Sequence, residues 1–211
     1  MTSETSVPVT TGSAFQKGKY FIIAASFWGD GKISGLEIAN EDRLRLPGTY
    51  IIEPPNGDPG QYPERPHLVH IPKLGGPPRD FEDTFGTWVV SETLKRVFES
   101  VDPEGFAFAA CDFTLADDTP GPPYYFCGVL RTIDALDEVA SRLKIKVGDF
   151  VNGKYYDRSG GANLVFKQDV VGAAHVFQTP FALEVFCDRV LRDAVIAAGL
   201  QGVRFADAAD C

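Results

Sequence analysis

Hydrophobic residues of this 211-residue chain first gather in a run near the N-terminus. Lys19–Trp28 reads KYFIIAASFW, and its aromatic and β-branched residues predict a buried strand. Gly29-Asp30-Gly31 follows and can make the tight turn of a hairpin, which places a second strand at Ile33–Ile38. Thr49–Glu53 predicts a further short strand. These elements indicate a β-rich unit in the N-terminal part of the chain.

The segment Pro54–Arg79 interrupts this pattern with eight prolines and four glycines in 26 residues. Prolines at this density remove backbone N–H donors, so the segment is expected to be a long surface loop or a linker. It contains His67 and His70, which could suggest a metal site. An extended segment would point these two side chains to opposite faces, and this argues against a shared metal.

From residue 85 the pattern becomes regular and repeats itself after 97 residues. Trp88–Phe108 and Val185–Phe205 each predict a strand, an N-cap (Ser91 or Asp188), an amphipathic helix, a glycine and a second strand. A duplication or two independent strand-helix-strand units would both produce this spacing, and we favour the second. The apolar stripes of the two helices predict buried side chains at four positions, namely Leu94, Phe98, Leu191 and Val195. Gly202 is expected to hold a backbone conformation that a side chain would spoil.

The remaining segments add strands and one short helix. Asp134–Leu143 carries an apolar stripe, and Asp134 and Asp137 resemble a capping box, so a short additional helix is expected there. Further strands are predicted at Tyr124–Arg131, Lys144–Val151, Lys154–Tyr156, Asn163–Lys167 and His175–Thr179. The predicted class is therefore α+β, with a mixed or mostly antiparallel sheet, two strand-helix-strand units and a short additional helix.

The expected domain organisation follows from these patterns. Residues 1–16 are rich in Ser and Thr and are expected to form a flexible leader. Residues 17–80 are expected to form an N-terminal β subdomain that includes the Pro/Gly-rich loop at 54–79. Residues 81–211 are expected to form the main α+β domain.

Charge is distributed unevenly along the chain. The net charge is −9, and residues 81–143 carry 12 acids but only 4 bases. Such a chain is not expected to bind nucleic acid, which requires a basic face. A solvated acidic face is the ordinary interpretation of this bias, and a docking face for a basic partner is the sharper one. The acids chosen as exposed contacts, in or beside turn-rich segments, are Glu82, Asp83, Asp117 and Asp118.

Few residues indicate catalysis, a cofactor or a membrane. Cys111, Cys127, Cys187 and Cys211 lie far apart, which is typical of reduced thiols, and no apolar stretch is long enough to span a bilayer. His175 alternates with apolar neighbours and is interpreted as a structural histidine. The abundant carboxylates leave a small carboxylate-dependent hydrolase open as an alternative, because such pairs meet in space rather than in sequence. No metal or other cofactor is predicted.

Four segments in order carry a resemblance to a known family: WVVSETLKRVFESVDPEGFAF, YYFCGVLRTIDALDEVAS, HVFQT and VFCDRVLRDAVIAAGLQGVRF. Over roughly residues 85–206 the chain resembles bacterial polymorphic-toxin immunity proteins of family eleven. The resemblance implies a cytoplasmic, non-catalytic protein that binds and neutralises a cognate toxin. A regulatory or scaffold protein-binding module is the other non-enzymatic alternative. The motif residues themselves are expected to determine the fold, with toxin specificity on the loops.

Overall fold

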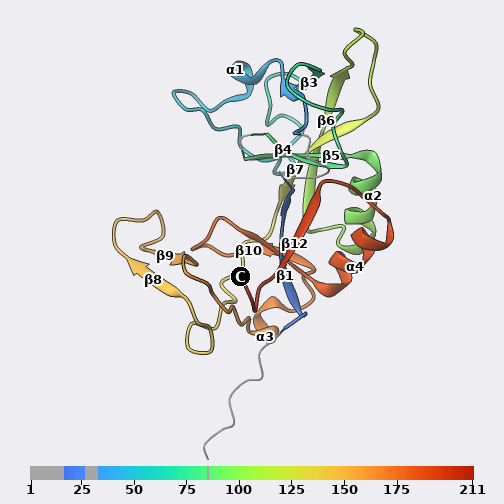
Figure 1. The fold of residues 1–211 in the computed structure, drawn as a ribbon. Helices are drawn as coiled ribbons and strands as arrows, with labels where there is room; N and C mark the ends of the chain where they lie inside the picture. Colours follow the sequence, from blue (N-terminus) through green and yellow to red (C-terminus); the bar gives the residue numbers. More distant parts are fainter. Residues whose placement is uncertain (1–16, 27–32, 85) are drawn as a thin grey trace, which may run out of the picture.

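The computed structural model describes residues 17–26, 33–84 and 86–211 (Figure 1). The expected leader at 1–16 and the expected turn at Gly29-Asp30-Gly31 lie outside these ranges. The helices of the described part are α1 (Glu41–Leu44), α2 (Glu92–Val101), α3 (Gln168–Val171) and α4 (Arg189–Ala197). Its strands are β1 (Tyr20–Ala25), β2 (Leu36–Ile38), β3 (His67–His70), β4 (Phe81–Thr84), β5 (Thr87–Ser91), β6 (Phe106–Thr114), β7 (Tyr124–Val129), β8 (Lys144–Val147), β9 (Lys154–Asp157), β10 (Val176–Gln178), β11 (Val185–Asp188) and β12 (Val203–Asp207).

The strands form two sheets and a separate hairpin. One sheet has the order β10-β11-β1-β12, the other has the order β2-β3-β6-β7-β5-β4, and β8 pairs with β9 alone. Neighbouring strands are antiparallel except β3 and β6, which run parallel. The expected α+β class with mixed or mostly antiparallel sheets is confirmed. Since β1 lies in one sheet while β2 and β3 lie in the other, the strands of residues 17–80 do not form a unit of their own.

The predicted helix at Asp134–Leu143 is wrong. This segment is irregular and joins the rest through isolated bridges, Leu136 to Phe166 and Arg142 to Asn163. The Asp137 side chain accepts the N–H groups of the residues two and three positions later and closes a single turn. An aspartate that bonds its own backbone in this way competes with helix formation. Only part of the apolar stripe is buried, because Val139 is 97% exposed.

Two predicted strands are absent from the structure, and one predicted loop contains a strand. Thr49–Glu53 contains no strand, and Asn163–Lys167 makes only isolated bridges. The proline-rich segment, expected as loop or linker, contains β3. The four residues of β3 contain no proline, so β3 can form ladders with β6, through residues 67–69, and with β2.

Two groups of strands and helices share one arrangement. We name β4, β5, α2, β6 and β7 the first repeat, and β10, β11, α4 and β12 together with β1 the second repeat. In the first, β7 lies between β5 and β6; in the second, β1 lies between β11 and β12. The registers also correspond, since Ser91 is opposite Tyr124 and Asp188 is opposite Tyr20. This agreement favours a duplication over two independent units.

Both repeats contribute to one central core. The buried members of this core include Leu94 and Phe98 of α2 and Leu191 and Val195 of α4, as predicted. The two helices contact each other on one side of the molecule (Figure 1). The Phe98 ring stacks on Phe106 with centroids 4.3 Å apart. The inner faces of the two sheets are therefore stabilised largely by apolar burial around the two helices.

The outer face of each sheet has a separate cover. Leu44 and Ile52, from the segment between β2 and β3, pack with Phe126 of the six-stranded sheet. Residues from 133–182, among them Phe166, pack on the four-stranded sheet at Phe186. Within the described ranges, no helix has the length and apolar character needed to cross a membrane.

Gly202 links α4 to β12 and has a φ of +84°, which confirms the expected special conformation. A Cβ atom at this position would overlap the carbonyl oxygen of Phe81. Only glycine combines this left-handed backbone with so close an approach to another chain segment.

Candidate functional site

Glu82, one of the four acids expected at the surface, is buried. Its side chain lies on β4, the residue is 5% exposed, and the Arg79 guanidinium contacts both carboxylate oxygens at 2.9 and 2.7 Å. The Arg79 backbone N–H adds a third bond at 2.7 Å. The expectation that Glu82 is exposed is therefore wrong, because a basic residue three positions earlier pairs with it inside the protein.

Asp83 is half-buried. It accepts the Gly86 N–H at 2.7 Å in the turn between β4 and β5. Burial raises the pKa of Asp83 above its usual value, and the Gly86 bond partly opposes this shift. Asp83 is therefore a less exposed contact than the turn position suggested.

Asp117 and Asp118 are exposed in the turn between β6 and β7, as expected. The Thr119 N–H and hydroxyl both donate to Asp117, and these bonds lower its pKa. Asp118 has a φ of +62°, a conformation that Asp tolerates better than most residues. Asp117 therefore remains charged at neutral pH, and both side chains are accessible to a partner.

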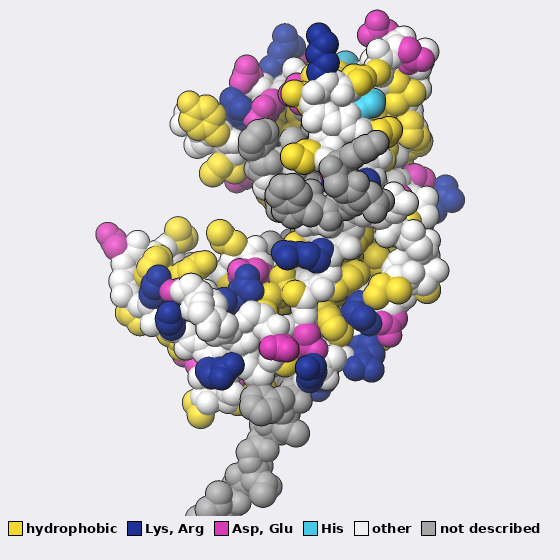
Figure 2. Space-filling view, in the orientation of Figure 1, with side chains coloured by type: hydrophobic (Ala, Val, Ile, Leu, Met, Phe, Trp, Pro, Cys, Tyr) yellow, Lys and Arg dark blue, Asp and Glu magenta, His cyan; other side chains and the backbone are white. Residues whose placement is uncertain are grey.

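The structure does not gather the four acids into one site. Because β5 is antiparallel to β7, the β4–β5 turn near Asp83 lies at the opposite end of these strands from the β6–β7 turn with Asp117 and Asp118. Charged groups of both signs are interspersed over the face shown in Figure 2.

Folding also neutralises much of the acidic segment 81–143. Arg65, Arg79 and Lys154, all from outside this segment, pair with acids inside it. The acids of the segment that lie in ion pairs are Glu82, Glu92, Glu99, Asp102, Glu104, Asp112 and Glu138. The excess of acids counted along the chain is therefore not an acidic face of the same size.

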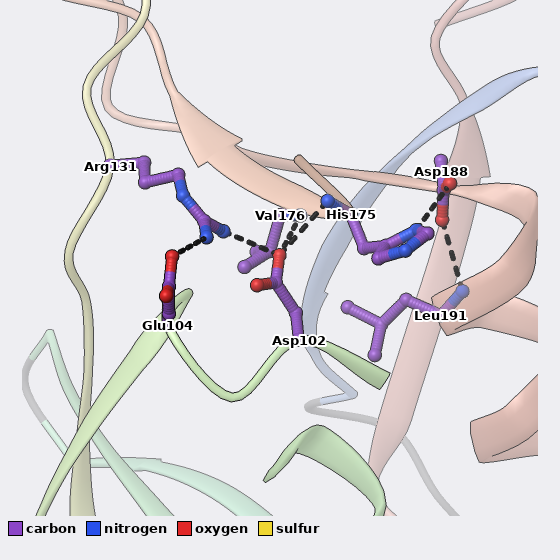
Figure 3. Close-up of polar contacts among 7 residues, drawn as sticks. All are labelled: Asp102, Glu104, Arg131, His175, Val176, Asp188 and Leu191. Carbon is purple, nitrogen blue, oxygen red and sulfur yellow. Dashed lines mark hydrogen bonds and ion pairs between the residues drawn. The ribbon is translucent and has the colours of Figure 1, made fainter. Parts of the chain in front are cut away.

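A buried carboxylate links the two repeats (Figure 3). Asp102 directly follows α2, is 4% exposed, and accepts a bond of 2.5 Å from Arg131. The same oxygen accepts the backbone N–H groups of His175 and Val176 at 2.9 and 3.3 Å. Glu104 lies 3.7 Å from the Arg131 guanidinium. Asp102 thus holds the start of β10 against the end of α2, and its charge is compensated inside the protein.

Asp80, which precedes β4 of the first repeat, makes a second link to the second repeat. Its carboxylate accepts the Ser91 hydroxyl at 2.7 Å and the N–H of Gln201, which follows α4, at 2.9 Å. The residue before β4 therefore contacts the end of α4, just as the residues at the start of β10 contact the end of α2. We call Asp80 and Asp102 the linking carboxylates.

His175 and Asp188 form a pair that could suggest catalysis. The His175 Nδ1 atom lies 2.8 Å from Asp188, whose other oxygen accepts the Leu191 N–H at 3.0 Å and caps α4 (Figure 3). A cavity of about 250 Å³ lies beside the pair, and the residues lining it include no Ser, Thr or Cys that could act as a nucleophile. Burial raises the pKa of the neighbouring Tyr20 hydroxyl, which makes it a poor nucleophile. The geometry favours the structural interpretation of His175.

The cysteines behave as packing residues. Cys127 and Cys187 are buried in the central core, and burial raises the pKa of both thiols. Burial also raises the pKa of Cys111, to about 12. Thiols in this state are unreactive at neutral pH. Among the described residues, no cluster of three or more His, Cys, Asp or Glu side chains is placed to hold a metal ion.

Comparison with known proteins settles the family. The model of the Immunity protein family (Imm11) matches residues 19–210. The chain belongs to the Imm11 immunity protein family. No curated protein shows a significant match to the sequence.

The Imm11 match extends well beyond the segment that carried the resemblance in the sequence. It begins immediately before β1, the middle strand of the second repeat, and includes both covers. The Imm11 domain of this chain therefore includes the segment 19–80, which sequence motifs alone did not assign.

Proposed function

We propose that this Imm11 protein is a cytoplasmic bacterial immunity protein that binds a cognate toxin and neutralises it without catalysis. The observation that carries the proposal is the family match over residues 19–210. An immunity protein protects the cell that makes the toxin by covering the toxin's active site or holding the toxin in an inactive form.

The state of the buried acids supports a binding role over hydrolysis. Glu82 and Asp102 are the buried carboxylates of the described residues, and each is occupied by a guanidinium and by backbone N–H groups. A carboxylate-dependent hydrolase needs two acids that converge on an open substrate site. Both carboxylates here are committed to internal partners instead.

The proposed function is tested by co-expression with the toxin. The probe is the C-terminal domain of a large secreted protein found by sequencing to be encoded beside this gene, produced from an inducible promoter in a sensitive host. We expect growth to stop with the toxin domain alone and to continue when the protein is co-expressed, and we expect purified toxin domain to retain the protein on a column. If the folded protein neither binds nor protects, the proposal is wrong for this toxin domain.

We further propose that Asp117 and Asp118 attract a basic toxin surface. Charges of opposite sign raise the association rate, and salt screens the effect. The variant Asp117→Asn/Asp118→Asn tests this, since Asn accepts the same Thr119 bonds and tolerates a positive φ. We expect association to slow several-fold at low salt and its salt dependence to weaken.

The matched control is Asp149→Asn/Asp169→Asn, which removes the same charge from exposed positions on other segments. If both double variants associate as fast as the wild type, the electrostatic role of the β6–β7 turn is refuted. Glu82 is left out of the design because replacing it would leave Arg79 without its main buried partner.

A further inference from the structure

One edge of β6 is only partly covered. The strand runs over Phe106–Thr114, and β7 pairs with its residues 106–111 on one side. On the other side β3 pairs with residues 112–114 only. Within the described part of the chain, the first two thirds of β6 therefore have no neighbouring strand on the β3 side.

The hydrogen bonds at both ends of β6 show which residues face the open side. The Leu130 N–H donates to the Gly105 carbonyl on the β7 side at 2.9 Å, and the Asp112 N–H donates to the Pro66 carbonyl on the β3 side at 2.8 Å. Because backbone groups alternate between the two sides of a strand, odd-numbered residues face β7 and even-numbered residues face away. Phe108 and Ala110 thus direct their N–H and C=O groups toward the open side.

A groove of about 380 Å³ runs along this open edge. One wall is β6 at residues 108–110, where Ala109 and Ala110 leave space, and the other wall is the proline-rich loop at residues 55–66. β3 begins only at His67, opposite Asp112, because the preceding Pro66 has no N–H to donate to the ladder. The sheet position occupied by β3 is therefore vacant beside residues 106–111.

We infer that this edge of β6 binds an extended segment of the cognate toxin as an added β-strand. The inference rests on the proposed function and specifies the surface that performs it. At the groove, the outward residues Phe108 and Ala110 offer four backbone hydrogen-bonding groups with which an added strand can pair. The flat, small side chains of Ala109 and Ala110 leave room for the incoming backbone.

The charges around the groove specify the occupant further. Asp58 and Glu64 lie on the loop wall, and Asp118 lines the adjoining depression beyond Ala110. The bases on this surface, Arg65 and the neighbouring Arg43, are each engaged with an acid, Asp112 and Glu64 respectively. The toxin segment is therefore expected to carry Lys or Arg beside its extended backbone.

The equivalent edge of the second repeat provides an internal comparison. The Ser26 N–H donates to the Gly202 carbonyl, so Val203 and Phe205 of β12 face outward as Phe108 does. This edge carries the exposed Arg204 where β6 has Ala107. A charge on an edge strand disfavours strand addition. Toxin binding is therefore expected at β6 and not at β12.

Amide hydrogen exchange resolved by NMR tests the inference in the full-length protein, free and bound to the toxin domain described above. We expect exchange at Phe108 and Ala110 to slow by at least tenfold in the complex. The Ala109 amide, which faces β7, and the Val203 and Phe205 amides of β12 should not change. This alternation distinguishes an added strand from contacts made by side chains on the sheet face.

The variant Ala110→Pro removes the outward N–H and fills the groove, whereas Ala110→Ser keeps the N–H with a side chain of similar size. We expect toxin affinity to fall at least tenfold for the first and to stay near wild type for the second. If the wild type binds and protects while Phe108 and Ala110 exchange as before, the inference is overturned and the proposed function stands. If the wild type does not bind, the proposed function itself fails.

Discussion

The two repeats have the same backbone arrangement but different polar residues at the start of the helix. In the first, the Ser91 hydroxyl caps α2 and donates to Asp80. In the second, Asp188 caps α4 and contacts the His175 ring. In both, the N-cap backbone N–H donates to the carbonyl of the same partner, at 2.9 and 3.0 Å. The position of the cap and its partner is thus retained while their chemistry differs.

The repeats differ most where they meet other segments. β6 has β3 as its next strand in the sheet and the proline-rich loop beside it, whereas β12 is the edge strand of its sheet. The turn at residues 115–123 joins β6 to β7, whereas the equivalent ends of β12 and β1 are the two ends of the described Imm11 domain. The repeated frame therefore accounts for stability, and the segments unique to each repeat are where partner specificity can vary.

The largest expected effect compares two equivalent core positions, Phe98 and Val195. Phe98→Ala should lower the free energy of unfolding by about 3–5 kcal/mol, because it removes a fully buried ring stacked on Phe106. Val195→Ala removes fewer atoms and should cost less. Urea unfolding of both variants measures the difference. Equal losses would mean that the buried Phe98 ring contributes no more to stability than the smaller Val195 side chain.

Gly202→Val should lower the free energy of unfolding by about 3 kcal/mol or more, since it combines a disfavoured positive φ with overlap at the Phe81 carbonyl. Gly105 is the equivalent residue in the first repeat and has no positive φ, so Gly105→Ala acts through overlap with Val176 and Asp102 alone. Thermal unfolding of each variant checks both. A Gly202→Val protein as stable as wild type would contradict the strained-turn argument.

Helix capping should contribute about 1–2 kcal/mol in each repeat. Ser91→Ala and Asp188→Ala are expected to destabilise by similar amounts, and the double variant should show the sum, since the caps do not touch each other. Asp188→Asn serves as the control, because it keeps an acceptor for the Leu191 N–H while removing the charge beside His175. A double variant far from additive would show that the linking carboxylates couple the two caps.

The smallest expected effect is that of a circular permutant. Asp207 accepts the Gly18 N–H at 2.7 Å, so the two ends of the second repeat are close. In the permutant, a short Gly-Ser linker joins Cys211 to Lys17, and the chain is opened between Asp117 and Asp118. The second repeat then has the continuous β12–β1 connection, and the first repeat has the chain ends between β6 and β7. We expect the same circular dichroism spectrum and a loss of only about 1 kcal/mol. Failure to fold cooperatively would show that the repeats are not equivalent.

Local patterns in the sequence were sufficient for the caps and the helix stripes. Ser91, Asp188 and Leu94 act within one helical turn, and their spacing alone predicts their roles. The segments that contain these caps and stripes also carry the resemblance to the immunity family. Gly202 was predictable because it lies in the short link between α4 and β12, where a glycine often supplies a backbone conformation that a side chain would spoil. The glycine that ends α4 itself is Gly199, with a φ of +67°.

Features that depend on distant contacts could not be predicted. Asp102 bonds the His175 amide 73 residues away, and nothing near Asp102 in sequence indicates this. Glu82 was predicted to be exposed because it lies beside a turn-rich segment, but the overall fold, which no local pattern gives, places it inside the protein against Arg79. The stripe at Asp134–Leu143 predicts a helix, but tertiary bridges to Asn163 and Phe166 hold the segment in another form. The open edge of β6 depends on where β3 begins, which only the three-dimensional pairing reveals.

The central position of β1 has a consequence for biosynthesis. β1 leaves the ribosome early, but its partners β11 and β12 lie about 160–180 residues later in the chain, which at ordinary translation rates corresponds to about 10–30 s. During that time the apolar strand YFIIAA has no partner strand, and the central core that both repeats build is incomplete. The four-stranded sheet closes only when the last residues emerge, so a truncated translation product lacks a complete second repeat.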